Sequence, residues 1–277
     1  MMDSPSRSSL DDAEVQENLD KAIELMEADP LSPEAVSLLR RNAGKGCTAS
    51  MVRLGLAFAD GDDGQRKESL ELFRKAAESG DPSGMRNLAY CYAIGLNCEK
   101  DKAKGADLYR KAAEMGNAVA MCNLGVMLSY GNGVEKDMEE AFRWYLRSAE
   151  GGCSRGMTNV GELYLWGSGT EKNVDEAEKW FRRSGSPRAD FRLAEVLLDE
   201  RGDVEEGMFF LRRSAERGYS RGLYRYGRVL EPDDPEKAAE MYSLAAAKGN
   251  KDAASRLEEL GRPVPASSMP RKKKRKS

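Results

Sequence analysis

Carboxylates beside glycine-rich turns are the first residues in this sequence whose types and spacing could perform chemistry. They are Asp62, Asp63, Glu171, Asp175 and Glu176. Paired acids can act as general acid and general base, but only in a pocket that fixes their separation and shifts their pKa values. Here the acids recur where helices are expected to begin, and the helix dipole favours negative charge at that end. We therefore expect them to be structural.

Histidine is absent from the 277 residues. It is the commonest general base and the commonest metal ligand near neutral pH. Its absence excludes Ser-His-Asp and Cys-His catalysis and the usual zinc sites. The sequence also lacks a Gly-x-x-x-x-Gly-Lys-Ser/Thr phosphate loop. We expect no enzymatic activity, no cofactor and no metal.

The five cysteines are odd in number and include no Cys-x-x-Cys pair. The first residues lack the basic and apolar regions of a secretory signal, and no stretch approaches the roughly 20 apolar residues that cross a bilayer. We expect an intracellular protein that is not secreted and does not span a membrane. Its cysteines should behave as small buried hydrophobes. Whether Cys91 and Cys98, the one close pair, ever bond is left open.

The sharpest local signal is a run of six cations near the C-terminus. These are Arg271, Lys272, Lys273, Lys274, Arg275 and Lys276. Such a run resembles a nuclear import signal read by an acidic groove on an import receptor, although it could also contact nucleic acid or anionic lipid, or serve only as a solubilising tail. The formal net charge is −3, so the six cations leave the rest of the chain at −9, which argues against a nucleic-acid surface on the body. We predict a nuclear protein, otherwise a cytoplasmic one.

The elements that carry these residues follow from a repeat. A glycine recurs every 36 residues, at Gly95, Gly131 and Gly167. A leucine-type position recurs at intervals of 31 to 36 residues, at Leu54, Leu88, Leu124, Val160, Leu193, Tyr226 and Leu257. A period of this length indicates stacked supersecondary units.

Each unit has the apolar spacing of two helices. In the third unit Met121, Leu124 and Leu128 fall at i, i+3 and i+7, and the glycines that follow break the helix. A second stripe then follows at Ala141, Trp144, Tyr145, Ser148 and Ala149. Small residues in register, at Gly125, Gly161 and Gly227, should let the two helices approach closely. We expect the aromatic residues Phe73, Tyr109, Trp144, Tyr145, Trp180 and Phe181 to be core.

These motifs resemble the Sel1-like repeat, a relative of the tetratricopeptide repeat. The match is Leu124-Gly125-x-x-Leu128, Gly131-x-Gly133-Val134, Glu140-Ala141-x-x-Trp144-Tyr145 and Ala149-Glu150-x-Gly152. The resemblance implies an all-α, right-handed α/α superhelical solenoid of about six repeats over residues 46–250. Residues 14–46 and 251–260 should cap its ends, because terminal repeats would otherwise expose apolar faces. Residues 1–13 and 261–277 should be disordered tails.

The resemblance also implies where partners bind. Related arrays line a concave groove with their first helices and hold an extended peptide there. The position before each ladder leucine is polar, and the candidate groove residues are Arg53, Arg86, Asn87, Tyr90, Asn123, Asn159, Glu162, Arg192, Tyr224, Arg225 and Arg228. The same polar residues could equally satisfy turns and solvate the groove.

The sequence therefore predicts a monomeric, non-catalytic scaffold or adaptor that binds peptide segments of other proteins. The alternative is a nuclear scaffold that contacts nucleic acid or anionic lipid through its basic tail. Some bacterial relatives are described as weak β-lactamases, but an open groove is wet, and water weakens the electrostatics that such chemistry needs.

Overall fold

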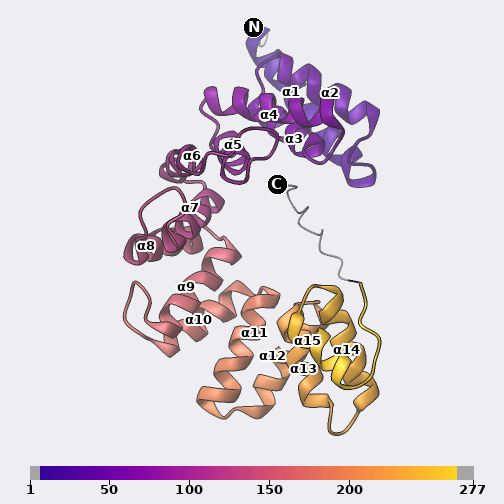
Figure 1. The fold of residues 1–277 in the computed structure, drawn as a ribbon. Coiled ribbons are helices and arrows are strands. Elements are labelled where there is room, and N and C mark those ends of the chain that lie inside the picture. The colour runs from indigo at the N-terminus through magenta and orange to yellow at the C-terminus, as the bar shows by residue number, and fades with distance from the viewer. Residues whose placement is uncertain (1–6, 267–277) are drawn as a thin grey trace, which may run out of the picture. The chain divides into compact units, whose positions relative to one another are not determined.

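The computed structural model is all helical over the residues that it describes, which are 7–266 for the backbone and 12–266 for the side chains. Within them are fifteen α-helices, one π-helical segment and no strand (Figure 1). The chain divides into two compact units, Met1–Gly151 and Gly152–Ser277. The predicted all-α fold of paired helices is confirmed.

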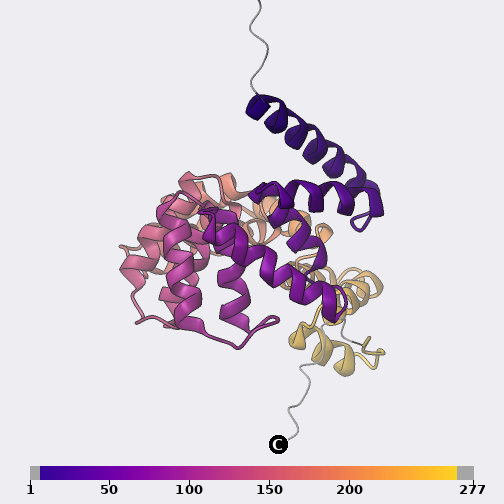
Figure 2. The same cartoon turned by 90° about the horizontal axis from the view of Figure 1, so that it is seen from above.

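Unit 1 consists of four helix pairs, and each helix packs against the next one along the chain (Figure 1; Figure 2). Its helices are α1 (Arg7–Ala28), α2 (Pro33–Gly44), α3 (Thr48–Phe58), α4 (Asp63–Glu78), α5 (Pro82–Ile94), α6 (Lys102–Glu114), α7 (Ala118–Tyr130) and α8 (Met138–Glu150). The odd-numbered members from α3 onward are the first helices of the repeat.

Unit 2 continues the same pattern of sequential packing. Its elements are α9 (Ser154–Trp166), α10 (Val174–Ser184), α11 (Pro187–Glu195), η1 (Val196–Arg201), α12 (Val204–Glu216), α13 (Ser220–Leu230), α14 (Pro235–Ala247) and α15 (Lys251–Glu259). The last helix covers the end of the α13–α14 pair, since Ala253 and Leu257 are buried in the same cluster as Tyr242.

The helix ends follow the expected chemistry. Pro82 and Pro187 occupy the first turns of α5 and α11, where a missing N–H does no harm. Gly131 ends α7 with φ of 64°, a left-handed conformation that glycine adopts without strain. Asp62 accepts a hydrogen bond from the backbone of Gln65, and the Gln65 side chain bonds back to the Asp62 backbone. The predicted structural role of the turn acids is confirmed at this helix start.

The two helices of a pair touch where a glycine on the first faces an aromatic ring on the second. A Cβ added to Gly161 would lie 2.5 Å from Cε1 of Phe181, and one added to Gly125 would lie 2.7 Å from the ring of Tyr145. The predicted aromatic core is confirmed, since none of its six members is more than 7% exposed. The glycine ladder therefore sets the helix separation, which in turn fixes which face of each first helix remains open.

Two features differ from the sequence prediction. The first helix begins at Arg7, whereas residues 1–13 were expected to be disordered. No glycine or proline interrupts residues 7–28, so the helical pattern extends further back than its apolar stripe. The fifth first helix, α11, continues directly into the π-helical segment η1, which ends at Gly202 with φ of 71°.

Candidate partner-binding site

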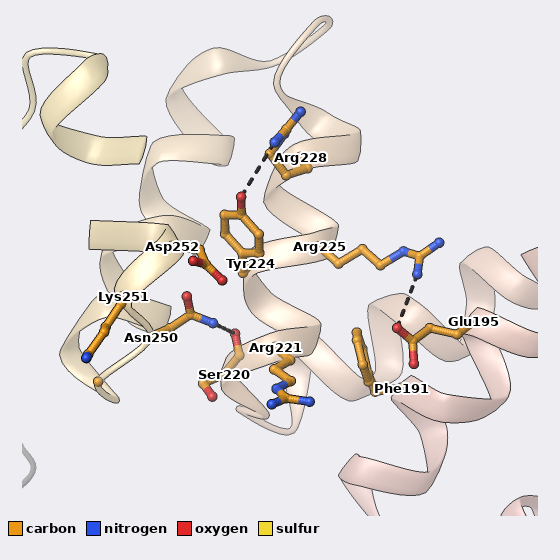
Figure 3. Close-up of a pocket in the computed structure, with 11 residues that line it drawn as sticks. Phe191, Glu195, Ser220, Arg221, Tyr224, Arg225, Arg228, Asn250, Lys251 and Asp252 are labelled. Carbon is orange, nitrogen blue, oxygen red and sulfur yellow. Dashed lines mark hydrogen bonds and ion pairs between the residues drawn. The ribbon is translucent and has the colours of Figure 1, made fainter. Parts of the chain in front are cut away.

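An open pocket of about 510 Å³ lies in unit 2 between α11, α13 and the start of α15 (Figure 3). Three of the predicted groove residues line it, Tyr224, Arg225 and Arg228. We call it the α13 pocket, because that helix supplies three of its four cationic side chains.

The rotation of α13 explains why its basic face lines the pocket. Arg221, Arg225 and Arg228 fall at i, i+4 and i+7, so they share one face with Tyr224. Another face is fixed against α14, because a Cβ at Gly227 would lie 2.7 Å from the ring of Tyr242. The close packing of this glycine leaves the arginines on the open side of the helix.

The four cations of the pocket differ in how far they are neutralised. Arg225 donates from Nη2 to both carboxylate oxygens of Asp199, at 2.7 and 3.0 Å. Arg228 donates only to the hydroxyl of Tyr224, at 3.5 Å. Arg221 and Lys251 are exposed and make no ion pair or side-chain hydrogen bond with any described residue. Arg221, Arg228 and Lys251 thus form no ion pair with a described residue, and Glu231 is a carboxylate whose charge acts on Arg228.

Aromatic side chains and a helix cap hold the walls of the pocket. Phe191 is 5% exposed and packs against Tyr219 with ring centroids 5.5 Å apart. Tyr224 packs against Tyr242 at 5.7 Å. Asn250 accepts a hydrogen bond from the Ala253 backbone at 2.9 Å, which caps α15 and places Lys251 at the edge of the pocket.

The other predicted groove residues of unit 2, Asn159, Glu162 and Arg192, form hydrogen bonds and ion pairs within the stack. Arg192 donates to Glu162 at 2.8 Å and to Glu195 at 2.8 Å, while Arg188 donates to Glu162 at 3.0 Å and to Asn159 at 3.3 Å. The side chain of Glu162 is 8% exposed and that of Arg192 is 13% exposed. The prediction that Asn159 and Glu162 face solvent is wrong, because both are buried: Glu162 pairs with Arg188 and Arg192 of α11, and Asn159 accepts a hydrogen bond from Arg188.

The remaining predicted residues lie in unit 1. Arg53 and Tyr90 are exposed, and Arg86 and Asn123 are half-buried. Asn87 is 6% exposed, so it also lies in the interior and not on the surface as predicted. Its Nδ2 is a buried side-chain atom without a hydrogen-bond partner among the described residues. The structure thus brings together the unit 2 members Tyr224, Arg225 and Arg228, and places the unit 1 members on a separate body.

Sequence reasoning missed Arg221, Lys251 and Phe191. Arg221 could have been found, since it precedes Arg225 by four residues on a helix whose register was known. Lys251 comes from α15, the first helix after the α13–α14 pair, and Phe191 lies on α11, one residue before Arg192. No local pattern predicts that these three meet.

The cysteines are free thiols, and Cys91 and Cys122 are buried. Burial raises the pKa of the Cys91 thiol to about 11, which makes it a poor nucleophile at neutral pH. Among residues 12–266, no three histidine, cysteine or acidic side chains gather in a way that could hold a metal ion.

Two further sequence predictions concern the C-terminal tail and the membrane. The proposed import signal, residues 271–276, lies outside the described residues. Within the part of the chain that is described, no helix combines the length and the apolar character needed to span a bilayer.

Comparison with protein families gives one match. The Sel1 repeat family matches six consecutive segments, residues 48–81, 82–117, 118–153, 154–186, 187–219 and 221–250. The segments coincide with the helix pairs from α3–α4 to α13–α14. No functionally curated protein is significantly similar in sequence.

Solved structures with the same fold include a Sel1 repeat protein from Oxalobacter formigenes, with a TM-score of 0.72 and 26% identity over 83% of this chain and 98% of that one. A protective antigen of uropathogenic Escherichia coli with an SLR fold has a TM-score of 0.66 and 26% identity over 92% of this chain. The match spans only 58% of the antigen. PilF of Pseudomonas aeruginosa shares the fold, with a TM-score of 0.55 and 21% identity over 78% of this chain and 97% of that one.

Proposed function

The chain belongs to the Sel1 repeat family, and we propose that it acts as a non-catalytic scaffold that binds a segment of a partner protein in the α13 pocket. Sel1 repeat proteins generally mediate protein–protein interaction. Membership of the family supports a role in protein binding, and the α13 pocket is the site that we assign to that role.

The observation that carries the proposal is the contrast between two groups of polar residues on the first helices of unit 2. Asn159, Glu162 and Arg192 bond to one another or to neighbouring helices. Arg221 and Arg228 line an open cavity of about 510 Å³ and form no ion pair with a described carboxylate. Desolvated and paired groups stabilise the stack, whereas exposed and unpaired cations beside aromatic rings remain available to a partner.

The cavity suits a peptide segment better than a reaction. It is lined by arginine, lysine, asparagine and aromatic side chains, with two carboxylates, Glu195 and Asp252. Glu195 is held by Arg192 and Arg225. The sequence offers no histidine to act as a general base beside them.

The six cations of residues 271–276 support a separate proposal, that the tail is read by an import receptor and directs the protein to the nucleus. Contact with nucleic acid or anionic lipid through the same tail is the alternative, and it predicts binding that falls steeply with added salt.

A steric block tests the pocket without changing its charge. Ser220 lines the cavity at the start of α13, so Ser220→Trp should fill it. Leu244→Trp on α14 is the matched control, because Leu244 is uncharged, 45% exposed and outside the pocket. In a quantitative pull-down from cells that express the protein, a discrete set of partners should be lost with Ser220→Trp and kept with the control. If both variants, each with native helicity, retain the same partners, the pocket is not the binding site.

A further inference from the structure

We propose that the α13 pocket recognises an acidic segment of the partner, with carboxylate side chains bound by Arg221, Arg228 and Lys251. This inference rests on the proposed function and adds to it the chemistry of the ligand. Its test therefore changes the charge of the pocket without filling it, whereas Ser220→Trp fills the pocket without changing its charge.

The charges that line the pocket favour an anionic ligand. The pocket is lined by four cations and two carboxylates. The two lining carboxylates are Glu195 and Asp252. Glu195 is engaged by Arg192 and Arg225, and Arg225 also pairs with Asp199 outside the pocket lining. The rest of the chain outside the tail carries a net charge of −9, so a cationic pocket is an exception on an acidic protein. A surface of this sign attracts anionic segments and repels basic ones.

Three cations of the pocket are available to bind an incoming carboxylate. Arg221 and Lys251 have no ion pair or side-chain hydrogen bond among the described residues, and Arg228 has one long bond to a neutral hydroxyl. An incoming carboxylate therefore breaks no internal ion pair at these three positions. Arginine presents a planar fork of donors that matches a carboxylate, which makes Arg221 and Arg228 the stronger of the three ligands.

The spacing of the two arginines along α13 matches that of acidic side chains on an extended segment. Arg221 and Arg228 are seven residues apart on one helix face, which corresponds to about 10 Å along the axis. In an extended polyproline-II segment, side chains three residues apart share a face and are separated by about 9 Å. Acidic residues at positions i and i+3 of the partner can thus each meet one arginine. Tyr224 lies between the two arginines and would contact the intervening residues (Figure 3).

One carboxylate in the pocket, Asp252, repels an acidic ligand. Asp252 lies in the first turn of α15, lines the pocket and makes no ion pair or side-chain hydrogen bond with a described residue. Its negative charge is favoured there by the helix dipole, but it faces the same space as the incoming carboxylates. Removing this charge should strengthen binding, a direction opposite to that of the cation variants.

The test is fluorescence anisotropy on the full chain with a short labelled peptide that carries Glu at positions i and i+3. The comparison peptides replace Glu by Gln or by phosphoserine. Arg221→Gln/Lys251→Gln should weaken binding of the Glu peptide about tenfold, and Asp252→Asn should tighten it about twofold. Arg212→Gln/Lys237→Gln is the control, since it removes the same charge from exposed positions outside the pocket. The basic tail is present in every variant, so binding to it cannot produce a difference.

Selective binding of the Glu peptide over the Gln peptide, with loss confined to the pocket variant, supports the inference. Equal binding of Glu and Gln peptides, equal loss in the control variant, or binding of the phosphoserine peptide alone overturns it. If the peptide fails while Ser220→Trp still removes partners in the pull-down, the pocket binds a partner of different chemistry. If Ser220→Trp removes none, the proposed function itself fails.

Discussion

Arg192 donates a hydrogen bond from Nε to Oε1 of Glu162 at 2.8 Å, and both side chains are almost fully buried. This pair joins α9 to α11, the first helices of two successive repeats. Both residues were predicted from the sequence to line a groove that binds a peptide. In this chain they stabilise the stack itself, and the open cations lie one repeat further along, on α13.

Replacing Glu162 by Gln should therefore lower stability. Glu162 pairs with Arg188 and Arg192, and its loss leaves the largely buried Arg192 guanidinium with Glu195 as its one remaining carboxylate partner among the described residues. We expect the free energy of unfolding to fall by about 2 kcal/mol, less than for a fully buried pair because Arg188 is partly exposed. Urea denaturation measures it. Glu200→Gln is the control, since Glu200 is exposed and should change stability by less than about 0.5 kcal/mol. Equal effects would show that the pair is not a structural tie.

Gly161 should tolerate no side chain. A Cβ there would lie 2.5 Å from Phe181, so Gly161→Ala must push α10 away from α9, at a cost of roughly 1–3 kcal/mol. Gly44→Ala is the matched control, because nothing lies within 4 Å of a Cβ at that helical glycine. Its melting temperature should stay the same or rise slightly. A Gly161→Ala variant as stable as the wild type would contradict the close approach of the two helices.

Stability should fall in acid through Glu231. Hydrogen bonds from Arg256 and Tyr242 lower the pKa of Glu231 from 4.5 to about 2. Because the folded pKa is depressed, the carboxylate stabilises the α13–α14–α15 region fully above about pH 4.5, and that contribution is lost as the pH falls toward 2. The difference in melting temperature between wild type and Glu231→Gln should shrink over this range. A difference that does not depend on pH would show that the carboxylate charge is not what stabilises this region.

The tail proposal has its own measurement. Deleting residues 271–276 from a fluorescent fusion should move the protein from the nucleus to the cytoplasm, because those residues are the six consecutive cations that an import receptor would read. Replacing three of the lysines by arginine keeps the charge and should preserve the distribution. An unchanged distribution after deletion would remove the import signal from consideration.

The helix pairs were predictable because their determinants are local. The spacing of Leu124, Leu128 and Trp144, with the glycine at 131, encodes a helix, a turn and a second helix without reference to the rest of the chain. The register of the glycine ladder likewise predicted where the two helices of a pair approach closely, whereas the contact of each glycine with an aromatic ring was seen only in the structure.

The binding site was less predictable because it depends on contacts between repeats. Whether Arg192 or Arg228 remains available is decided by the acids near them. Glu162 and Glu195 form ion pairs with Arg192, whereas Glu231 acts on Arg228 without forming one. The position of Lys251 depends on how α15 is capped against Ser220, through a hydrogen bond from Asn250 at 3.4 Å. Neither relationship has a counterpart in a single repeat.

Site-specific photo-crosslinking tests most directly whether the α13 pocket holds the partner. The photoreactive analogue p-benzoylphenylalanine would replace Tyr224 in the pocket or, as the control, Phe209 on α12, which is 50% exposed and outside it. Position 224 should give a discrete adduct that position 209 does not give and that Ser220→Trp abolishes. Adducts of the same kind from both positions, or a discrete adduct from position 209 alone, would contradict the binding of a partner in the α13 pocket.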